Sequence, residues 1–382
     1  MRIALVIERL DPSRGGRETS TAQIAAALTT RGHEVTVLCQ DGVAGDWPFA
    51  MRQLGRRGAS RWQRAIAFAA DAGAAAAKGK FEIVHATLPV PGANVYQPRG
   101  GTVPGQLAAG RRRWGAMGPL RKWLVEPMNL TRRMQAIMEQ RLVANPRAMC
   151  LAVSQMVAEE FAHYYGLQDN VRVVYNGVDL PARDDAARVQ HRRELRGHIG
   201  ADEGETVFVT AATNPRLKGV DFAIDAFGRW CASRGDRPGG RLVVIGGREE
   251  ASLRHRSARA GAAERVTFVP HTSDMAAWYA AADACILLSW YDPCSRVVLE
   301  AVAMGVPAIT TVFNGAAEIL ADGAGIVVSS PKDAVGVAAA LDALGDPARR
   351  AATAEACTRA ADGITIDRHV RRLLGVYSEV LA

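Results

Sequence analysis

The chain has 382 residues, which is enough for two domains of ordinary size, each with its own hydrophobic core. Hydrophobic residues make up 48% of the sequence and no apolar run approaches the roughly 18–20 residues of a membrane-spanning helix, so we expect a soluble enzyme without such a helix. The formal net charge of +8 alone would allow a nucleic-acid partner, but no recognised binding motif accompanies it and we expect none.

Cysteine usage and the first residues indicate the compartment. The six cysteines are scattered without a C-x-x-C pair, which argues for a reducing cytoplasm and against structural zinc or a disulfide framework. The apolar run at Met1 is too short and too soon acidic for a signal peptide, so it predicts a buried strand. No D-x-D motif and no cluster of His, Cys and carboxylate residues suggests a metal ion, so we expect a metal-independent protein.

The first half of the sequence alternates strand and helix, which predicts a doubly wound sheet. Residues 2–7 predict a strand, Gly15 and Gly16 a turn, and residues 19–28 a helix. Further strands are predicted at 81–86, which ends near His85, and at 94–97, just before Arg99. Because strand ends in an open sheet face the ligand crevice, His85 and Arg99 are candidate acceptor-side residues, with a purely structural role as the alternative.

Much of the excess positive charge is concentrated in the segment from Arg99 to Arg147. Ten Lys or Arg residues and only two Glu residues lie there, with Trp114 and Trp123 among them. Basic residues interleaved with Trp suit an anionic membrane surface or a phosphorylated acceptor. A solvated helix face is the alternative. After it, residues 148–153 and 171–174 predict strands, 155–165 a helix that Ser154 caps, and the charged residues 181–203 a linker.

The second half begins again with a strand, 206–212, a loop and a helix, 220–230. The loop carries Arg216 and Lys218 at the mouth of the helix, where two cations and backbone donors can neutralise a diphosphate. Two solvated surface charges are the alternative. The strand 241–245 then ends in a glycine turn at Gly246, which is another crevice position.

Residues 285–307 carry the most specific pattern. An apolar strand is followed by a turn at Asp292-Pro293 and by a helix that we expect Ser295 to cap. The first amides of such a helix attract anions, phosphate above all. Glu300 lies inside this otherwise apolar helix, either as a structural cap or as a hydrogen-bond acceptor for a ligand hydroxyl.

Asp292 and Glu300, separated by seven residues and followed by Ala-Val-Ala-Met-Gly-Val-Pro, resemble the acidic-x7-Glu signature of family 4 glycosyltransferases. The resemblance implies an α/β protein of GT-B fold, with two Rossmann-like domains facing across a cleft and retention of anomeric configuration. It places an acceptor-binding domain at 1–180, joined by a C-terminal helix at 366–382 that crosses back to it, and a nucleotide-sugar domain at 181–365. Residues 91–96 and the basic segment are similar to the lipopolysaccharide core glucosyltransferase branch.

The same resemblance implies the roles of individual residues. Glu300 would bind the ribose of a nucleotide-sugar, and Asp292, where the family usually has Glu, would meet the donor sugar. Arg216 and Lys218 would clamp the diphosphate, which makes Arg216, Lys218 and Asp292 the expected catalytic set. The remaining expected donor-binding residues are Gly15, Gly16, Gly246, His271, Met275, Cys294, Ser295, Arg296 and Val297.

These features together predict a retaining hexosyltransferase. We expect it to move glucose from a UDP donor to a lipid-linked or cell-envelope saccharide, in the cytoplasm or peripherally on the inner membrane. The nucleotide-sugar is a substrate, so no cofactor is expected. An epimerase of the same fold and a non-catalytic nucleotide-sugar or membrane-binding module are the alternatives.

Overall fold

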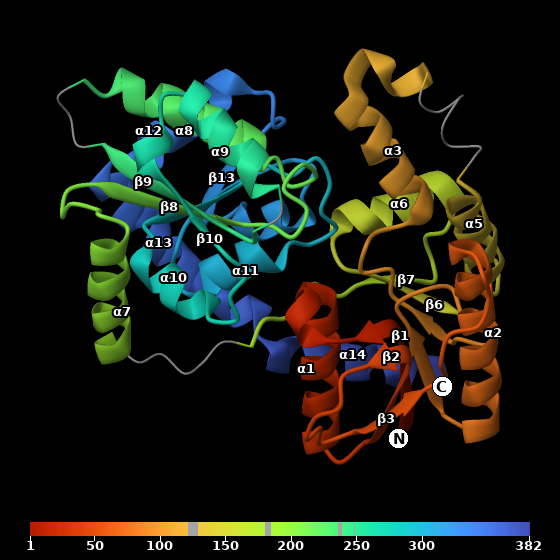
Figure 1. Ribbon diagram of the computed structural model, residues 1–382. Helices are drawn as coiled ribbons and strands as arrows, with labels where there is room; N and C mark the ends of the chain where they lie inside the picture. Colours follow the sequence, from red (N-terminus) through yellow and green to blue (C-terminus); the bar gives the residue numbers. More distant parts are fainter. Residues whose placement is uncertain (121–128, 180–184, 236–238, 248) are drawn as a thin grey trace. The chain divides into compact units, whose positions relative to one another are not determined.

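The computed structural model describes residues 1–120, 129–179, 185–235, 239–247 and 249–382 (Figure 1). The chain divides into two compact units, one formed by Met1–Gly177 with Ile366–Ala382 and the other by Val178–Thr365. Each unit contains one fully parallel sheet with helices packed on it, so the predicted pair of Rossmann-like α/β domains is confirmed. Within the residues described, no helix combines the length and apolarity that crossing a bilayer demands.

The N-terminal unit has a seven-stranded sheet in the order β3-β2-β1-β4-β5-β6-β7. Its strands are β1 (Arg2–Leu10), β2 (Glu34–Gly42), β3 (Ala50–Gln53), β4 (Ile83–Ala86), β5 (Val95–Tyr96), β6 (Met149–Ala152) and β7 (Val171–Val173). The order runs outward from β1 to β3 and restarts on the other side at β4. Ligand sites of open parallel sheets form at such a reversal, outside the carboxyl ends of the strands.

Six α-helices are described in this unit. They are α1 (Gly16–Thr30), α2 (Arg61–Gly79), α3 (Val103–Trp114), α5 (Leu130–Val143), α6 (Gln155–Tyr165) and α14 (Ile366–Leu381). Helix α6 begins and ends where the sequence predicts, because the Ser154 side chain accepts a hydrogen bond from the Val157 amide and Gly166 adopts φ +65°.

The last helix, α14, belongs to the core of the N-terminal unit. Its buried side chains Val370, Leu373, Val376 and Tyr377 recur at helical spacing and pack with residues of β1, β2 and α1. The predicted return of the C-terminal helix to the N-terminal domain is therefore confirmed.

The C-terminal unit has a six-stranded sheet in the order β10-β9-β8-β11-β12-β13. Its strands are β8 (Thr206–Ala211), β9 (Gly240–Ile245), β10 (Val266–Val269), β11 (Ala284–Leu287), β12 (Ala308–Thr311) and β13 (Gly325–Val328). Its α-helices are α7 (Asp185–His198), α8 (Val220–Ser233), α9 (Glu250–Arg259), α10 (Met275–Ala281), α11 (Arg296–Ala303), α12 (Ala334–Gly345) and α13 (Pro347–Ala361). Short 3₁₀ turns in the two units cover Pro12–Arg14, Gly115–Met117, Ala263–Arg265, Gly315–Leu320 and Asp362–Ile364.

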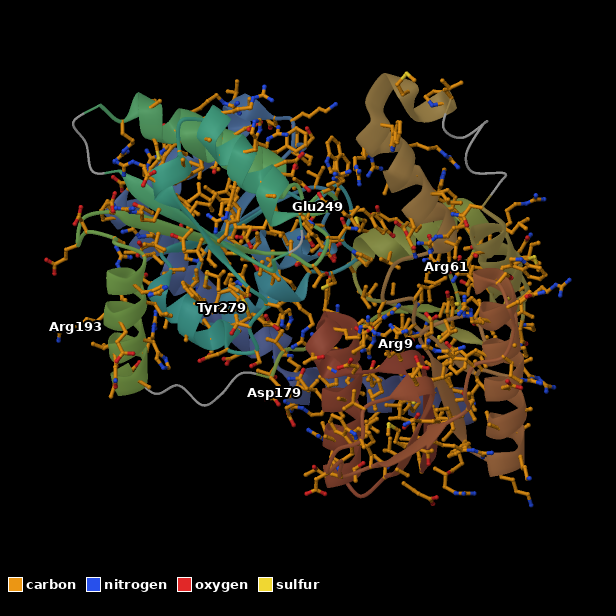
Figure 2. The ribbon with its side chains drawn as sticks, viewed as in Figure 1. Arg9, Arg61, Asp179, Arg193, Glu249 and Tyr279 are labelled. Carbon is orange, nitrogen blue, oxygen red and sulfur yellow. The ribbon has the colours of Figure 1, made fainter. Side chains whose placement is uncertain are left out.

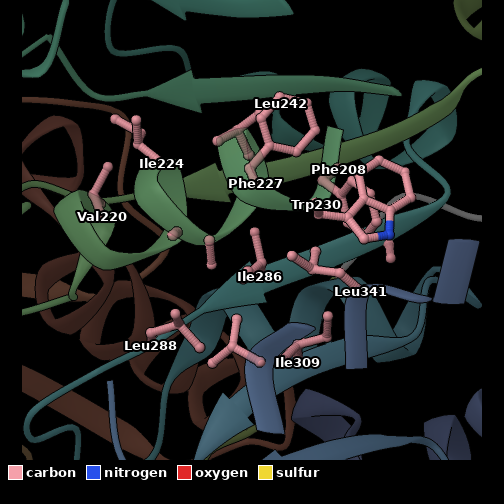
Figure 3. Packing of buried hydrophobic residues seen from close by; sticks show 14 of the residues in the cluster. Phe208, Val220, Ile224, Phe227, Trp230, Leu242, Ile286, Leu288, Ile309 and Leu341 are labelled. Atoms are coloured by element: carbon pink, nitrogen blue, oxygen red, sulfur yellow. The ribbon is translucent and has the colours of Figure 1, made fainter. Parts of the chain in front are cut away.

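Aromatic side chains fill the core on one face of this second sheet (Figure 3). Phe208 of β8 meets Trp230 of α8 edge to face, with ring centroids 5.4 Å apart. The Trp230 indole N–H donates to the Asp342 carboxylate at 2.9 Å, which satisfies the one polar atom of a fully buried ring. The packed α8 fixes the loop that precedes it.

The predicted linker over 181–203 is wrong for most of its length, because Asp185–His198 form helix α7. The charged residues that suggested a solvated linker are paired instead. Arg192 and Arg196 donate to the buried carboxylate of Asp283 at 2.6 and 2.9 Å, and this attaches α7 to the end of α10. Removing such a buried partner is costly, so the helix is an integral part of the C-terminal unit.

Candidate donor site

Two loops meet at the strand reversal of the C-terminal sheet, one after β8 and one after β11. The Trp290 amide donates to the Leu217 carbonyl at 2.9 Å and joins the loops directly. The Lys218 ammonium contacts the Asp292 carboxylate, with side chains 22% and 10% exposed. The structure therefore brings together two of the three residues predicted to be catalytic.

Two glycines allow these loops to approach one another closely. Gly219 follows Lys218 with φ +64°, and an added Cβ would lie 2.0 Å from the Leu288 carbonyl oxygen. Gly246, after β9, has φ +141°, and an added Cβ would lie 2.3 Å from the Ala212 carbonyl oxygen. Only glycine fits both the backbone angle and the space at these positions. Consequently the loops after β8, β9 and β11 hold one another in place.

Arg216, the third predicted catalytic residue, is held differently. Its Nε donates to Oε2 of Glu249 at 2.7 Å, and its side chain is 60% exposed (Figure 2 labels Glu249). An exposed ion pair of this kind contributes little stability. The Arg216 guanidinium can therefore exchange the Glu249 carboxylate for a phosphate at small cost.

The Asp292 loop is held rigidly by its backbone. The Asp292 amide donates to the Phe313 carbonyl at 2.9 Å, and the Gly315 amide donates to the Asp292 carbonyl at 2.8 Å. The buried Asn314 side chain accepts from the Ser295 amide at 3.2 Å. Asn314 is a positioning residue that was not predicted, because its contact with Ser295 depends on the neighbouring position of the β11 and β12 loops, although it also bonds the nearby Thr310 and Ala316.

The predicted cap of α11 is wrong in one detail. Ser295 occupies the N-cap position, but its side chain makes no capping hydrogen bond. Asn314 fixes the turn there by holding the Ser295 amide, so the serine hydroxyl is not needed for that purpose. Arg296 and Val297 form the first turn of α11 as predicted.

Glu300 has two side-chain partners. Arg296 donates from Nη2 and Nε to Oε1 of Glu300 at 3.0 and 3.2 Å, and the Tyr279 hydroxyl donates to Oε2 at 3.3 Å (Figure 2 labels Tyr279). The structural-cap alternative would need a backbone donor, but the partners of Glu300 are these two side chains. Burial and the charge of Glu300 raise the pKa of Tyr279 well above its usual value, so this hydroxyl remains a donor. The carboxylate is thus held at a fixed position on α11.

The other predicted donor-binding residues are distributed over both units. Cys294 is buried in the loop before α11, His271 is exposed after β10, and Met275 opens α10. Gly15 and Gly16 belong to the N-terminal unit, where Gly15 precedes α1 and Gly16 is its first residue. The described residues contain no group of three or more His, Cys, Asp or Glu side chains placed to hold a metal ion.

His85 and Arg99, the acceptor-side candidates, are bound within the N-terminal unit. His85 is buried at the end of β4, with Nδ1 2.7 Å from the hydroxyl of Tyr377 on α14. Arg99 donates to the Gln97 side chain at 3.1 Å and to the Thr21 hydroxyl at 3.2 Å. Through these hydrogen bonds, both residues join elements of the N-terminal unit to one another.

Burial of His85 predicts a pH-dependent stability. Burial, followed by the charge of Arg99, lowers the pKa of His85 well below 6.5, so the ring stays neutral in the fold but protonates in the unfolded chain. The unfolded state then binds more protons, and stability falls as pH drops below about 6.5, by up to about 1.4 kcal/mol per pH unit. We expect His85→Gln to flatten the slope of unfolding free energy between pH 7.5 and 5.5, measured by urea titration. An unchanged slope would contradict this account, and His255→Gln, at an exposed site of the other unit, is the matched control.

Comparisons with known proteins agree with this architecture. Residues 14–181 match the profile described as Glycosyltransferase Family 4, and residues 204–346 match that of Glycosyl transferases group 1. The D-inositol 3-phosphate glycosyltransferase of Jonesia denitrificans is 30% identical over 254 residues, 64% of this chain and 60% of that protein. The chain covers 47% of its counterpart from Pseudarthrobacter chlorophenolicus, also at 30% identity, so it spans less than two thirds of these relatives.

Solved structures share the fold along almost the whole chain. WaaG, a glycosyltransferase involved in lipopolysaccharide biosynthesis, superposes with a TM-score of 0.82 at 20% identity, over 98% of this chain and 99% of WaaG. Anabaena Alr3699/HepE in complex with UDP and glucose gives a TM-score of 0.73 at 17% identity, over 99% of both chains. With the two profiles matching successive halves, the chain belongs to the group 1 and family 4 glycosyltransferases and has the GT-B fold.

Proposed function

We propose that the protein is a retaining, metal-independent hexosyltransferase that moves glucose from a UDP donor to a lipid-linked or cell-envelope saccharide. The observation that carries this proposal is the Lys218–Asp292 pair at the strand reversal of the C-terminal unit, where the Asp292 loop leads into the helix that carries the fixed carboxylate of Glu300. HepE, a structural neighbour, was solved with UDP-glucose, and WaaG is involved in lipopolysaccharide biosynthesis. Both relationships support the choice of donor and acceptor class.

The reaction requires charge stabilisation on the leaving diphosphate. As the bond between the anomeric carbon and the phosphate oxygen breaks, negative charge grows on the diphosphate. Lys218, Arg216 and the amides at the start of α11 are the groups of the C-terminal unit that would bind it. Cations and amides held in advance stabilise the transition state without reorganisation.

Asp292 and Glu300 are assigned to binding rather than to nucleophilic attack. Asp292 would accept from hydroxyls of the donor sugar, and Glu300 from hydroxyls of the ribose. The acceptor oxygen would then bond to the anomeric carbon on the face that the diphosphate leaves. Its proton would pass to an oxygen of the departing diphosphate, which retains the configuration and balances the transfer.

A panel of UDP-, GDP- and ADP-glucose in a thermal-shift assay tests the donor, because a ligand bound only by the folded state raises its melting temperature. We expect UDP-glucose to give the largest increase in melting temperature. We also expect the protein to hydrolyse UDP-glucose slowly when no acceptor is present. Without acceptor, formation of a 2-epimer or of another UDP-sugar would indicate the epimerase. Absence of all turnover would indicate the binding module. The anomer of the transferred sugar, read by proton NMR, tests retention.

Membrane association is a separate proposal for the segment around the end of α3. Trp114 and Met117 are 53% and 51% exposed, Leu120 is exposed as well, and Arg111, Arg112 and Arg113 precede them. Trp123 and the cations Arg121 and Lys122, which contributed to the sequence prediction, lie outside the described residues. Apolar and Trp side chains beside arginines suit the interface of an anionic bilayer.

Vesicle flotation tests this second proposal. We expect the protein to float with vesicles that contain anionic lipid and not with zwitterionic vesicles, and expect 0.5 M salt to weaken binding because exposed charges are screened. Trp114→Ser should reduce the bound fraction several-fold. Equal binding to both kinds of vesicle would refute the electrostatic part of the proposal.

A further inference from the structure

A large pocket lies at the carboxyl edge of the N-terminal sheet and is lined entirely by residues of that unit. Its volume is about 830 Å³, within the usual range for small-molecule sites. Residues at the ends of β1, β2 and β4 form its base, at the point where the strand order reverses. One carboxylate, Glu8, faces six guanidinium groups in the lining: Arg9, Arg17, Arg56, Arg61, Arg64 and Arg132.

Part of this positive charge is neutralised within the fold. Asp41 accepts hydrogen bonds from Arg9 at 3.1 Å and from Arg56 at 2.6 and 2.7 Å, and the Arg56 bond chiefly holds the pKa of Asp41 below its usual range. Arg17 pairs with Glu18 at 3.4 Å. These pairs involve three of the six arginines.

The other three arginines form no ion pair at contact distance with a described carboxylate, although the charge of Arg132 interacts with that of the buried Glu139. Arg64 donates to the Ser60 carbonyl at 3.3 Å, and Arg132 donates to the Gln135 side chain at 3.3 Å, both neutral acceptors. Arg61 is exposed and makes no hydrogen bond within that part of the chain (Figure 2 labels Arg61 and Arg9). Arg61 and Arg64 thus have no carboxylate partner in the described part of the chain, and Arg132 adds a third cation to the same pocket lining.

Two of these arginines, Arg61 and Arg64, lie where a positive charge destabilises helix α2. Helix α2 begins at Arg61 with a Ser60–Gln63 capping box, and its first turn contains no acidic residue. A cation near a helix N-terminus is unfavourable because the macrodipole is positive there. Arg61 and Arg64 add their charges to that same positive end. An anion bound in the pocket would turn each of these unfavourable terms into a favourable one.

The pocket also offers groups that suit a sugar. Gln40, at the end of β2, is only 6% exposed, and its side-chain amide has no hydrogen-bond partner among the described residues. Hydroxyl groups of a ligand fit both the donor and the acceptor of this amide. Phe68 and Pro89 give the pocket an apolar wall.

We propose that this pocket binds the acceptor saccharide through a phosphomonoester on it, with Arg61, Arg64 and Arg132 on the phosphate and Gln40 on a hydroxyl. The inference rests on the proposed glycosyl transfer and names the chemical class of the acceptor. Arginine binds phosphate in a bidentate manner that neutral or single-point contacts cannot reproduce. A soluble sugar phosphate and a phosphorylated saccharide on a lipid share this chemistry.

Calorimetric titration of the full chain tests the proposal, with glucose 6-phosphate, glucose and inorganic phosphate as probes and without donor. We expect glucose 6-phosphate to bind at least tenfold more tightly than glucose, and Arg61→Gln/Arg64→Gln to remove that preference. Arg141→Gln, at an exposed arginine of α5 outside the pocket, is the matched control and should leave it unchanged. The single variant Arg61→Gln, which loses no internal bond within the described chain, serves if the double variant does not fold.

Binding of UDP, measured in parallel, separates failure of this inference from failure of the proposed function. Suppose that UDP binds. If glucose 6-phosphate then binds no more tightly than glucose, or if the double variant keeps the preference for glucose 6-phosphate, the inference is overturned and the donor assignment stands. If glucose 6-phosphate binds as expected and UDP does not, the donor assignment fails. Turnover assays with soluble and with lipid-linked phosphorylated saccharides then identify the source of the phosphate.

Discussion

Lys218→Ala is expected to lower kcat by about 10²- to 10³-fold, the usual effect of removing one preorganised donor from a developing negative charge. The ammonium is the cation of the β8 loop that the structure holds beside Asp292, so it is already desolvated and positioned before the donor binds. Its loss also leaves the Asp292 carboxylate without its cation near the incoming diphosphate. We therefore expect weaker UDP-glucose binding in addition to the loss in kcat.

Steady-state kinetics with UDP-glucose measure this effect, and Lys78→Ala, at an exposed lysine of α2, is the matched control. The double variant Lys218→Ala/Asp292→Asn should recover part of the lost UDP affinity, because it removes the uncompensated negative charge. Its kcat should stay low, since the stabilising cation is still missing. A Lys218→Ala enzyme within a factor of two of the wild type would refute our account of the leaving group.

Glu300→Gln is expected to weaken UDP binding by about 10- to 100-fold, which corresponds to about 1.4–2.7 kcal/mol. Arg296 and Tyr279 satisfy part of the carboxylate without ligand, so the side chain is held in place when the ribose arrives. The amide keeps the shape but loses the charge that makes such an acceptor strong. Titration calorimetry with UDP measures the loss, with Glu355→Gln, at an exposed site of α13, as control.

A second ligand separates ribose binding from a structural role. The wild type should prefer UDP over 2′,3′-dideoxy-UDP, and Glu300→Gln should bind the two nearly equally. If Glu300 only stabilises α11 through Arg296, the variant would melt at a lower temperature and keep the wild-type preference. That result would remove the ribose assignment and leave the fold untouched.

Local signals explain which elements were predictable. Helix α6 has a serine cap and a terminating glycine within its own sequence, and α14 has apolar residues at helical spacing. Helix α2 was not predicted, although a Ser60–Gln63 capping box begins it and its buried residues, Phe68, Ala69, Ala72, Ala75 and Ala76, recur at helical spacing. Helix α7 was mistaken for a linker because the partner of its arginines, Asp283, lies about ninety residues further along the chain.

The donor site depends both on local sequence patterns and on the order of the strands in the sheet. Lys218 was recognisable because it lies in a loop at the mouth of a helix, and Asp292 because of the acidic-x7-Glu resemblance. Their direct contact and the role of Asn314 depend on strand order, which brings β8, β11 and β12 side by side. Sequence spacing does not encode that order.

The sequence by itself determined the alternation of strands and helices and the loops that carry the donor-site residues, because periodicity and turn residues are local, and the resemblance carried by the acidic-x7-Glu spacing implied the two-domain fold with its returning C-terminal helix. Only the tertiary structure decided that the Tyr279 hydroxyl contacts Glu300, and that arginines from positions 9 to 132 line one pocket. The physical reason is that a parallel sheet collects the ends of strands far apart in the chain at one edge. Charges that look scattered in the sequence therefore act together in the fold.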